Sequence, residues 1–357
     1  MDIGERKVDH ISICLYRDVE SKKESNWFEF VYLVHQALPE LNLKDVDIST
    51  TFLGKRFKAP LLIDCMTGGP KKAQEINSIL ASVASELGIG LGVGSQRAAL
   101  ENPEYEKGFA VVRDVAPDIF VMANIGAPQL KGLKPQDVRR MIDMVRADAL
   151  VVHLNPLQEV IQVEGEPFYS DVLSSLEKLV KEAEVPVIVK EVGCGISRET
   201  VLKLEMVGVK AVNVAGLGGT SWAGVEAIRA QEMGREDKAR LGKAFWDWGI
   251  PTAASILEVR SVSKIPLIAS GGIRNGIEIA KALALGADMV AFALPIIKRA
   301  LKSGKEGVSA YIEEVLEELR TAMFLTGSKG VEEMKGKRYI LTGKLKDWVE
   351  GLGGPGI

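Results

Sequence analysis

Cysteine is scarce in this sequence, and its few copies are far apart. The 357 residues contain three cysteines, at Cys14, Cys65 and Cys194. Because they form neither a C-x-x-C pair nor an even set, we expect no disulfide scaffold and no structural zinc site. Widely spaced cysteines fit a reducing compartment, so we expect a cytoplasmic protein.

Long apolar runs are also lacking. No run approaches the ~18–20 residues that a membrane-spanning helix needs. The first ten residues, MDIGERKVDH, are too charged for a signal peptide. We therefore expect a globular protein that is not inserted in a membrane.

An excess of charge of one sign is missing as well. The chain has 45 Lys and Arg against 48 Asp and Glu, a net charge of −3, so nucleic acid is not an expected partner. Hydrophobic residues make up 46% of the chain, enough for a large core. A chain of this length has room for two average domains or for one α/β barrel of ~250 residues with additions.

Eight short apolar runs recur along the chain and predict strands. Each run is almost continuously apolar, as is typical of parallel strands buried on both faces. Segments of helical period separate them, which predicts a TIM (β/α)8 barrel. An open doubly wound sheet is the alternative, but the regular repeat and the lack of a G-x-G-x-x-G opening favour the barrel. The runs are residues 60–66, 88–94, 118–124, 149–155, 185–191, 211–217, 265–270 and 289–295.

Three regions lie outside the eight regular units. Residues 1–59 precede the first strand and are expected to cap the barrel, with a short antiparallel pair near their end. Residues 223–248 form a charged insertion after the sixth strand, and such insertions often act as mobile lids. We assign the barrel to residues 60–330 and a C-terminal segment to residues 331–357.

Glycine-rich turns after several strands predict a phosphate site. In TIM barrels the active site lies at the carboxyl ends of the strands, and phosphate is commonly bound after strands seven and eight. Here Gly272, Ile273 and Arg274 follow strand seven, while Ala293 and Leu294 follow strand eight. Backbone N–H groups and a helix N-terminus would face the anion at this place.

Lys190 closes the apolar run VPVIV and must therefore lie inside the barrel mouth. Its charge could neutralise a barrel carboxylate, form a Schiff base, or face an electron-rich cofactor. The side chains expected around it are neutral hydrogen-bonding groups that suit a planar heterocycle edged with amides and carbonyls. Together these features predict flavin mononucleotide (FMN). The neutral side chains belong to Thr67, Ser95, Asn124 and Thr220.

A polar cluster follows strand four. His153 and Asn155 share one face of that strand by its two-residue period, and Gln158 and Glu159 come directly after. A single histidine can be a core residue and a single glutamate a solvated one, but the cluster favours an active site. One carboxylate suits a Mg²⁺ ion that keeps its waters and bridges to substrate phosphate oxygens.

Basic residues near the N-terminus form a second candidate group. A charged N-terminal patch is usually only solvated. If residues 1–59 fold over the mouth, however, Arg6 and Lys7 could join Arg97 in binding a diphosphate.

Taken together, these motifs resemble the type 2, flavin-dependent isopentenyl-diphosphate isomerases. The resemblance runs from Arg6-Lys7-x-Asp-His to Ala293-Leu294 and shows no departure at a motif position. HLNPLQE at residues 153–159 and GGTSW at residues 218–222 are its most specific parts, whereas MTGG and SGGIR also occur in other flavin barrels.

The resemblance implies a full set of site residues. It implies Gln158, His153 and Asn155 in catalysis, and Mg²⁺ on Glu159. The FMN contacts it implies are Cys65, Met66, Thr67, Ser95, Asn124, Lys190, Thr220, Gly272, Ile273, Arg274, Ala293 and Leu294. The diphosphate contacts it implies are Arg6, Lys7, Ser95, Gln96, Arg97 and Gln158.

The resemblance also implies a reaction and its requirements. A double bond moves from isopentenyl to dimethylallyl diphosphate without net redox change, yet the flavin must be reduced, so NADPH or NADH primes it. A homo-oligomer, tetramer or octamer, is expected. Because an alkene is a poor base, its protonation needs an acid in a dry pocket. The mouth offers one histidine, one glutamine and no spare carboxylate, so we predict reduced flavin as acid and base.

Four other functions are alternatives. A hydroxy-acid oxidase needs a histidine base late in the barrel, but the histidines are His10, His35 and His153. A dehydrogenase of the inosinate type needs a cysteine after strand six, where this chain has GGTSW. A lysine-dependent aldolase could use Lys190, and a non-catalytic flavin-binding protein would leave the strand-four cluster without a role.

Overall fold

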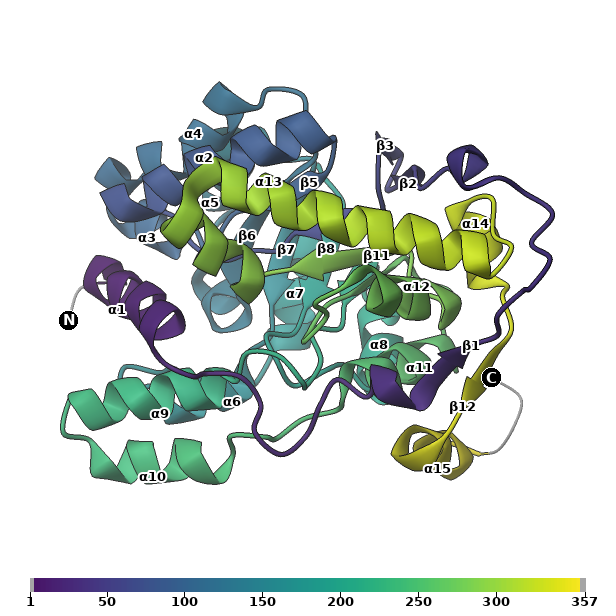
Figure 1. The fold of residues 1–357 in the computed structure, drawn as a ribbon. Helices are drawn as coiled ribbons and strands as arrows, with labels where there is room; N and C mark the ends of the chain where they lie inside the picture. Colours follow the sequence, from purple (N-terminus) through teal and green to yellow (C-terminus); the bar gives the residue numbers. More distant parts are fainter. Residues whose placement is uncertain (1–2, 354–357) are drawn as a thin grey trace.

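A closed barrel of eight parallel strands forms the centre of the structure, a computed structural model that describes residues 3–353. The strands follow one another around the barrel in chain order, with β11 closing onto β4 (Figure 1). Each overlaps one predicted run, so the predicted TIM barrel is confirmed. The strands are β4 (Leu61–Ile63), β5 (Gly90–Gly92), β6 (Val121–Gly126), β7 (Ala149–His153), β8 (Val187–Lys190), β9 (Ala211–Asn213), β10 (Leu267–Ala269) and β11 (Met289–Phe292).

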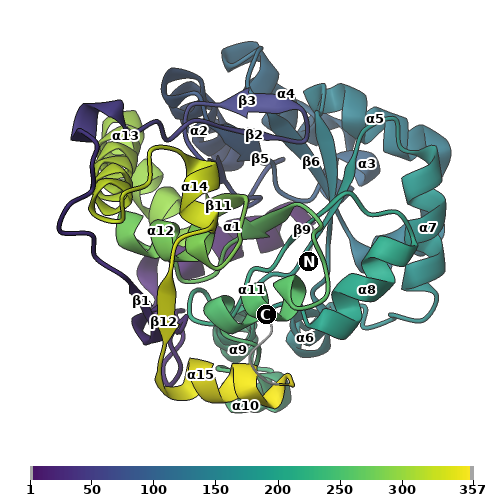
Figure 2. The same cartoon turned by 90° about the vertical axis from the view of Figure 1, so that its right-hand side faces the viewer.

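Helices surround the barrel as a ring, which Figure 2 shows most clearly. Their apolar faces cover the outside of the strands, so all strand residues except His153 are buried. This double burial explains the continuous apolar runs. The ring helices are α2 (Lys71–Leu87), α4 (Lys107–Val115), α5 (Pro135–Val145), α7 (Val172–Glu182), α8 (Arg198–Met206), α11 (Thr252–Arg260), α12 (Gly276–Ala284) and α13 (Leu294–Leu325).

A β-hairpin closes the amino-terminal end of the barrel. It consists of β2 (Thr50–Phe52) and β3 (Lys55–Phe57), the antiparallel pair expected before the first strand. Phe57 packs edge-on against Phe120 at 5.4 Å between ring centroids, within an apolar cluster made by the starts of the strands. The hairpin therefore covers the end opposite to the predicted active site.

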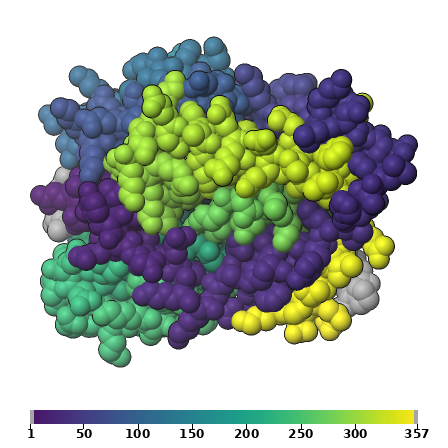
Figure 3. Space-filling model, in the orientation of Figure 1, coloured from purple at the N-terminus to yellow at the C-terminus, as the bar shows by residue number. Residues whose placement is uncertain are grey.

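The segments before and after the barrel join each other. Strand β1 (Val31–Leu33) pairs antiparallel with β12 (Tyr339–Leu341), a contact that the sequence did not predict. Helix α1 (Ile3–Tyr16) lies against the barrel mouth and contacts α13 and the insertion. Figure 3 shows this purple N-terminal segment crossing one face between the insertion and α13. The remaining short helices are α3 (Arg97–Glu101), α6 (Pro156–Ile161), α14 (Val331–Lys335) and α15 (Gly343–Gly351).

The insertion after β9 is a helical hairpin. Helices α9 (Trp222–Glu232) and α10 (Glu236–Ala244) pack side by side, and α9 also contacts α6 and α1 (Figure 1). Glu226 and Arg229 of α9 are both buried, so the charged residues of this segment are not simply solvated. Its motion as a lid stays a prediction. Among residues 3–353, no helix is both long and apolar enough to cross a membrane.

Candidate active site

One cavity opens at the carboxyl ends of the strands, and residues after all eight strands line it. Helix α1 contributes Arg6, Lys7 and His10 to the same wall. The cavity therefore collects residues that the sequence separates by almost 300 positions. The predicted site residues that line it are Arg6, Lys7, Cys65, Met66, Thr67, Ser95, Arg97, Asn124, His153, Asn155, Gln158, Glu159, Lys190, Thr220, Gly272, Ile273, Arg274, Ala293 and Leu294.

Gln96 is the exception among the predicted residues. Its side chain is fully buried and points away from the cavity: Nε2 donates to the Met141 carbonyl at 3.0 Å, and Oε1 accepts from the Asn124 N–H at 3.0 Å. The predicted contact between Gln96 and a diphosphate is therefore corrected. Gln96 instead braces the backbone of β6 beside the cavity.

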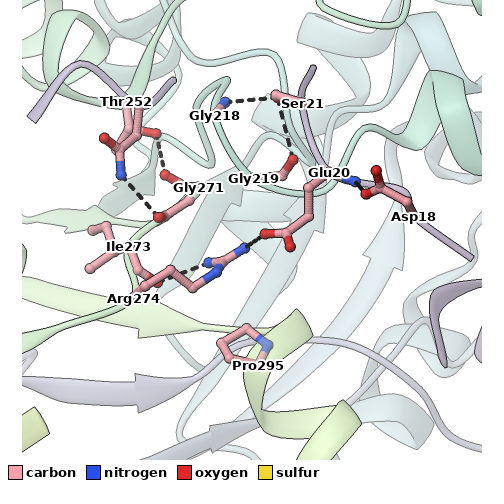
Figure 4. Close-up of polar contacts among 12 residues, drawn as sticks. Asp18, Glu20, Ser21, Gly218, Gly219, Thr252, Gly271, Ile273, Arg274 and Pro295 are labelled. Carbon is pink, nitrogen blue, oxygen red and sulfur yellow. Dashed lines mark hydrogen bonds and ion pairs between the residues drawn. The ribbon is translucent and has the colours of Figure 1, made fainter. Parts of the chain in front are cut away.

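The turn after β10 packs tightly on the turn after β9. Gly272 has a φ of 75°, and a Cβ on Gly219 would lie 2.4 Å from the Gly272 nitrogen, so a side chain would separate the two turns. The Thr252 hydroxyl donates to the Gly271 carbonyl at 2.6 Å and fixes the same turn from behind (Figure 4). Glycine is thus required here for close backbone approach.

Unpaired N–H groups gather where the phosphate is predicted. Within residues 3–353, the backbone N–H groups of Gly272 and Ile273, and those of Ala293 and Leu294 at the start of α13, have no hydrogen-bond partner. A helix N-terminus and orphan N–H groups together attract an anion. The Arg274 N–H does not contribute, because it donates to Glu278 at 2.8 Å.

A strap, defined here as residues 19–26, crosses these two turns. Glu20 forms an ion pair with the guanidinium of Arg274, which also donates to the Ile273 carbonyl at 2.9 Å (Figure 4). The Ser21 N–H donates to the Gly219 carbonyl at 2.9 Å, and the Asn26 side chain donates to the Gly272 carbonyl at 2.9 Å. The strap therefore links α1 to the candidate phosphate site.

Four polar residues at strand ends are here called the polar floor. Asp64, Lys190 and Ser270 line the cavity, and Asn213 is hydrogen-bonded to Asp64 and Ser270. Lys190 Nζ donates to the Glu191 carbonyl at 2.7 Å and lies 3.6 Å from Asp64 Oδ2. One role considered for Lys190 was to neutralise a carboxylate of the barrel. The structure contains such a carboxylate, that of Asp64, which was not identified from the sequence. The lysine still lines the cavity.

His153 is neutral in this environment. Burial, and then the charges of Lys190 and Lys7, lower the pKa of its imidazole to about 3. Its Nδ1 lies 2.8 Å from Asn124 Oδ1, and because an amide oxygen only accepts, Nδ1 carries the proton. The side chain therefore orients Asn124 and is not a proton donor near neutral pH.

Asn155 orients the two residues that follow it on α6. Its Nδ2 donates to Gln158 Oε1 at 3.1 Å and to Glu159 Oε1 at 2.9 Å. The hydroxyl of Tyr169 fixes Asn155 in turn, donating to its Oδ1 at 2.9 Å. Asn155 is buried, so these bonds are shielded from water.

A buried carboxylate stands directly behind Gln158, and the sequence analysis missed it. Glu226 Oε1 accepts hydrogen bonds from His10 Nε2 at 2.8 Å and from Gln158 Nε2 at 3.1 Å. The expectation of one mouth histidine and no spare carboxylate is therefore wrong. A signal was available: Glu226 follows Trp222 of the specific GGTSW motif by four residues, which places both on one face of a helix.

Glu226 is ionised despite its burial. Burial raises the pKa of this carboxyl, but interaction with His10 and Gln158 and the nearby Arg229 outweigh it and hold the pKa below its ordinary value. Its second oxygen, Oε2, has no hydrogen-bond partner among the described residues. This oxygen instead faces the guanidinium of Arg229, whose Nη1 lies 3.6 Å away.

The predicted basic residues come together at the mouth. Lys7 donates to the carbonyls of Gly68 at 2.7 Å and Ser95 at 2.8 Å. Burial, and then the adjacent charge of Arg6, lower the pKa of Lys7 to about 7. Arg97 completes the group and is held in place by Glu101 at 2.8 Å and Glu166 at 3.0 Å.

Comparison with known proteins identifies the family. A protein of Methanosarcina mazei named isopentenyl-diphosphate delta-isomerase is 47% identical over 348 residues, which cover 98% of this chain and 94% of that one. One of the same name from Pyrococcus furiosus is 46% identical and covers 97% of this chain and 88% of its own. The chain belongs to the isopentenyl-diphosphate delta-isomerase family.

This isomerase-family chain also resembles flavin-dependent oxidoreductases. Residues 155–341 match the FMN-dependent dehydrogenase family. Among solved structures, a mandelate oxidase variant with an FMN adduct has a TM-score of 0.62 at 19% identity, covering 90% of this chain and 94% of that one. A mandelate oxidase with (S)-2-phenylpropionate has a TM-score of 0.61 at 18% identity. At such low identity the likeness establishes the shared barrel fold.

The cavity of this isomerase-family chain fits a flavin mononucleotide. The Thr67 hydroxyl is buried and lacks a hydrogen-bond partner among the described residues, as expected of a group aimed at a ligand. The orphan N–H groups at Gly272 and Leu294 suit the phosphate. Lys190 supplies a positive charge on the cavity wall between these features and α6.

The described residues of this family member offer fewer ligands for a metal ion than they offer contacts for FMN. No group of three or more histidine, cysteine, aspartate or glutamate side chains that could hold a metal occurs in residues 3–353. Glu159 already accepts from Asn155, and its Oε2 accepts from the Glu166 N–H at 2.7 Å. The residues fit a Mg²⁺ ion only if water and substrate oxygens complete its coordination.

Proposed function

We propose that this chain interconverts isopentenyl diphosphate and dimethylallyl diphosphate. The observation that carries the proposal is a cavity with two separate anion sites and, behind Gln158 of its wall, the buried carboxylate of Glu226. One anion site is the basic group at the mouth, and the other is the group of orphan N–H groups after β10 and β11. A cofactor phosphate and a substrate diphosphate can occupy them at the same time.

The substrate diphosphate binds at the basic group. Arg6, Lys7 and Arg97 provide positive charge, and Ser95 and Gln158 provide neutral hydrogen bonds. Glu159 would hold a Mg²⁺ ion here, which would supply further positive charge for binding the diphosphate.

FMN binds across the rest of the cavity. We propose that its ring contacts Cys65, Met66, Thr67, Ser95, Asn124, Lys190 and Thr220, and that its phosphate contacts the turns Gly272–Arg274 and Ala293–Leu294. When bound in its reduced form, the flavin supplies an electron-rich ring that exchanges a proton. NADPH or NADH provides the electrons for this reduction.

Side chains of α6 and α9 accept the proton that leaves the substrate. Gln158 lies between Glu226 and the cavity, and its amide connects the carboxylate to the substrate space. Since Glu226 is ionised and its Oε1 accepts a hydrogen bond from Gln158, it can hold a proton that leaves the substrate and is relayed through that amide. Asn155 keeps Gln158 in position, and neutral His153 keeps Asn124 in position.

An isotope experiment tests the reaction. The protein is incubated without oxygen with FMN, Mg²⁺ and dithionite, isopentenyl diphosphate is added in D₂O, and proton NMR follows the products. We expect dimethylallyl diphosphate with deuterium at the protonated carbon, and only when the flavin is reduced. Tight FMN binding without conversion would refute the isomerase function and redirect attention to redox substrates.

Two further expectations accompany this proposal. We propose a homo-oligomer, tetramer or octamer, and a cytoplasmic location. Light scattering of the purified protein measures the assembly directly.

A further inference from the structure

The polar floor contains a carboxylate that the proposed reaction does not use. Asp64 follows β4, and its side chain is 6% exposed, next to Lys190 at 7%. Asp64 Oδ2 accepts from Asn213 Nδ2 at 3.2 Å, and Asp64 Oδ1 accepts from the Cys65 N–H at 2.8 Å. Both hydrogen bonds are donated to the carboxylate, which suits its ionised form.

Burying this ion pair costs desolvation free energy. Moving a carboxylate and an ammonium out of water costs several kcal/mol for each ion, and their attraction often does no more than offset it. An asparagine at position 64 could accept a hydrogen bond from Asn213 or from the Cys65 N–H through its amide oxygen, and it would carry no charge. The charge of Asp64 therefore calls for a role beyond holding the floor together.

The field of Asp64 reaches into the cavity. The thiol of Cys65 lines the cavity, and its pKa is raised to about 12 by burial and then by Asp64, with Lys190 opposing less strongly. The negative charge of Asp64 therefore acts on a group that lines the cavity. Near Lys190, the carboxylate of Asp64 reduces the positive potential of the ammonium group. It does not cancel that potential, because the two charged groups are 3.6 Å apart.

We propose that Asp64 lowers the reduction potential of the flavin bound in this cavity, acting through Lys190. This inference rests on the proposed FMN site. Reduction adds two electrons to the flavin ring, and where fewer than two protons follow, the ring becomes more negative. Lys190 stabilises that charge, and Asp64 reduces the stabilisation by offsetting Lys190 and holding its ammonium at the floor.

A lower reduction potential would change how readily the reduced flavin takes up a proton. A ring whose added charge is poorly stabilised is a stronger base, and proton transfer benefits from a stronger base. An uncompensated lysine would instead favour a flavin that accepts electrons from a substrate. Asp64 is therefore a positioning residue that biases the site toward proton exchange.

The test is the midpoint potential of bound FMN in Asp64→Asn. It is measured by slow enzymatic reduction without oxygen beside a reference dye. We expect the variant to bind FMN and its potential to rise, with at least a tenfold gain in the ratio of reduced to oxidised flavin at a fixed potential. For a two-electron couple this gain is about 30 mV. Asp64→Ser is the second variant if Asp64→Asn does not fold.

Two controls make the result specific. Ser270→Ala removes a hydroxyl 3.3 Å from Asp64 without changing charge, so it should shift the potential far less than Asp64→Asn does. In a Lys190→Met background, Asp64→Asn should shift the potential less than it does alone. A full shift without Lys190 would show that Asp64 acts directly and would overturn the proposed route.

Failure of this inference differs from failure of the proposed function. Wild-type protein that binds no FMN, or that binds it without isomerisation, defeats the proposed function. An unchanged potential in Asp64→Asn, with FMN bound and isomerisation intact in the wild type, overturns the role of Asp64 alone.

Discussion

The two ends of the barrel treat charge in opposite ways. At the amino-terminal end, Asp148 accepts from Arg113 at 2.6 Å and from the Val121 N–H at 2.8 Å. At the carboxyl end, Glu226 Oε2 and Thr67 Oγ1 have no hydrogen-bond partner among the described residues. Asp148 at the closed end is satisfied by the protein itself, while the Thr67 hydroxyl at the open end lines the cavity and is free to bind a ligand.

An arrangement of charged residues recurs at the closed, amino-terminal end of the barrel, whereas the groups described at the open, carboxyl end do not recur. Four βα units after Asp148, Asp288 accepts from Arg260 at 2.9 Å and from the Leu267 N–H at 2.7 Å. Each aspartate precedes a strand, and each N–H opens the strand before it. A structural need recurs in both halves of a symmetric barrel, whereas each group at the mouth has its own chemical task. Unsatisfied and unrepeated polar groups therefore mark the functional end.

The largest effect is expected at the open end, in Glu226→Gln. The amide keeps a hydrogen-bond acceptor at Oε1 but cannot take a proton, so we expect kcat for isomerisation to fall about 10²–10⁴-fold with little change in KM. Steady-state kinetics with reduced FMN measures both. Glu232→Gln on the same helix, which pairs with exposed Arg17, is the matched control. Full activity in Glu226→Gln would remove Glu226 from the mechanism.

A substitution at the closed end should lower the free energy of unfolding and leave kcat unchanged. Asp148→Ala leaves the buried guanidinium of Arg113 without its carboxylate, which typically costs about 3–5 kcal/mol in the free energy of unfolding. Denaturant titration measures this loss, and kcat of the folded fraction should stay unchanged. A large loss of kcat without a loss of stability would contradict the division between the two ends.

A pH profile sharpens the comparison at Lys7. With its pKa lowered to about 7, Lys7 is charged below that pH and neutral above it. We therefore expect kcat/KM, which reports the free enzyme, to fall as pH rises through about 7. In Lys7→Met this fall should disappear and kcat/KM should be low throughout. A wild-type profile that is flat between pH 6 and pH 9, on the order of three units around this pKa, would argue against it.

The smallest effect is expected at the strap. Glu20 and Arg274 are both partly exposed, so their ion pair is worth about 0–1 kcal/mol. In Glu20→Gln we expect FMN to dissociate up to about fivefold faster, while kcat at saturating FMN stays the same. Flavin fluorescence after dilution measures the release. Slower release would mean that Glu20 repels the phosphate and does not hold the turn.

The sequence predicted the barrel because buried parallel strands leave a local signature. Each of the eight runs is apolar on both faces, and the barrel then collects the residues that end the strands. Gln96 was assigned wrongly because Ser95 and Arg97, on either side of it, face the cavity while it points outward. No local period records that alternation within a turn.

Other residues escaped prediction because distant packing places them. Glu226 and His10 meet only when the insertion and α1 fold together over the mouth. Asp64 reads as one polar residue at the end of an apolar run, and only barrel closure brings Lys190 and Asn213 to it. The pairing of β1 with β12 likewise joins two short strands across nearly the whole chain.

The strap sets an order of events in time. Asn26 is made early by the ribosome, yet its side-chain bond to Gly272 must wait for 246 further residues. Contacts so distant along the chain are slow to form, because the loop they close must first be ordered. The barrel wall can therefore assemble before the mouth is complete. During biosynthesis, the strap can close over the two turns only after Gly272 has been made.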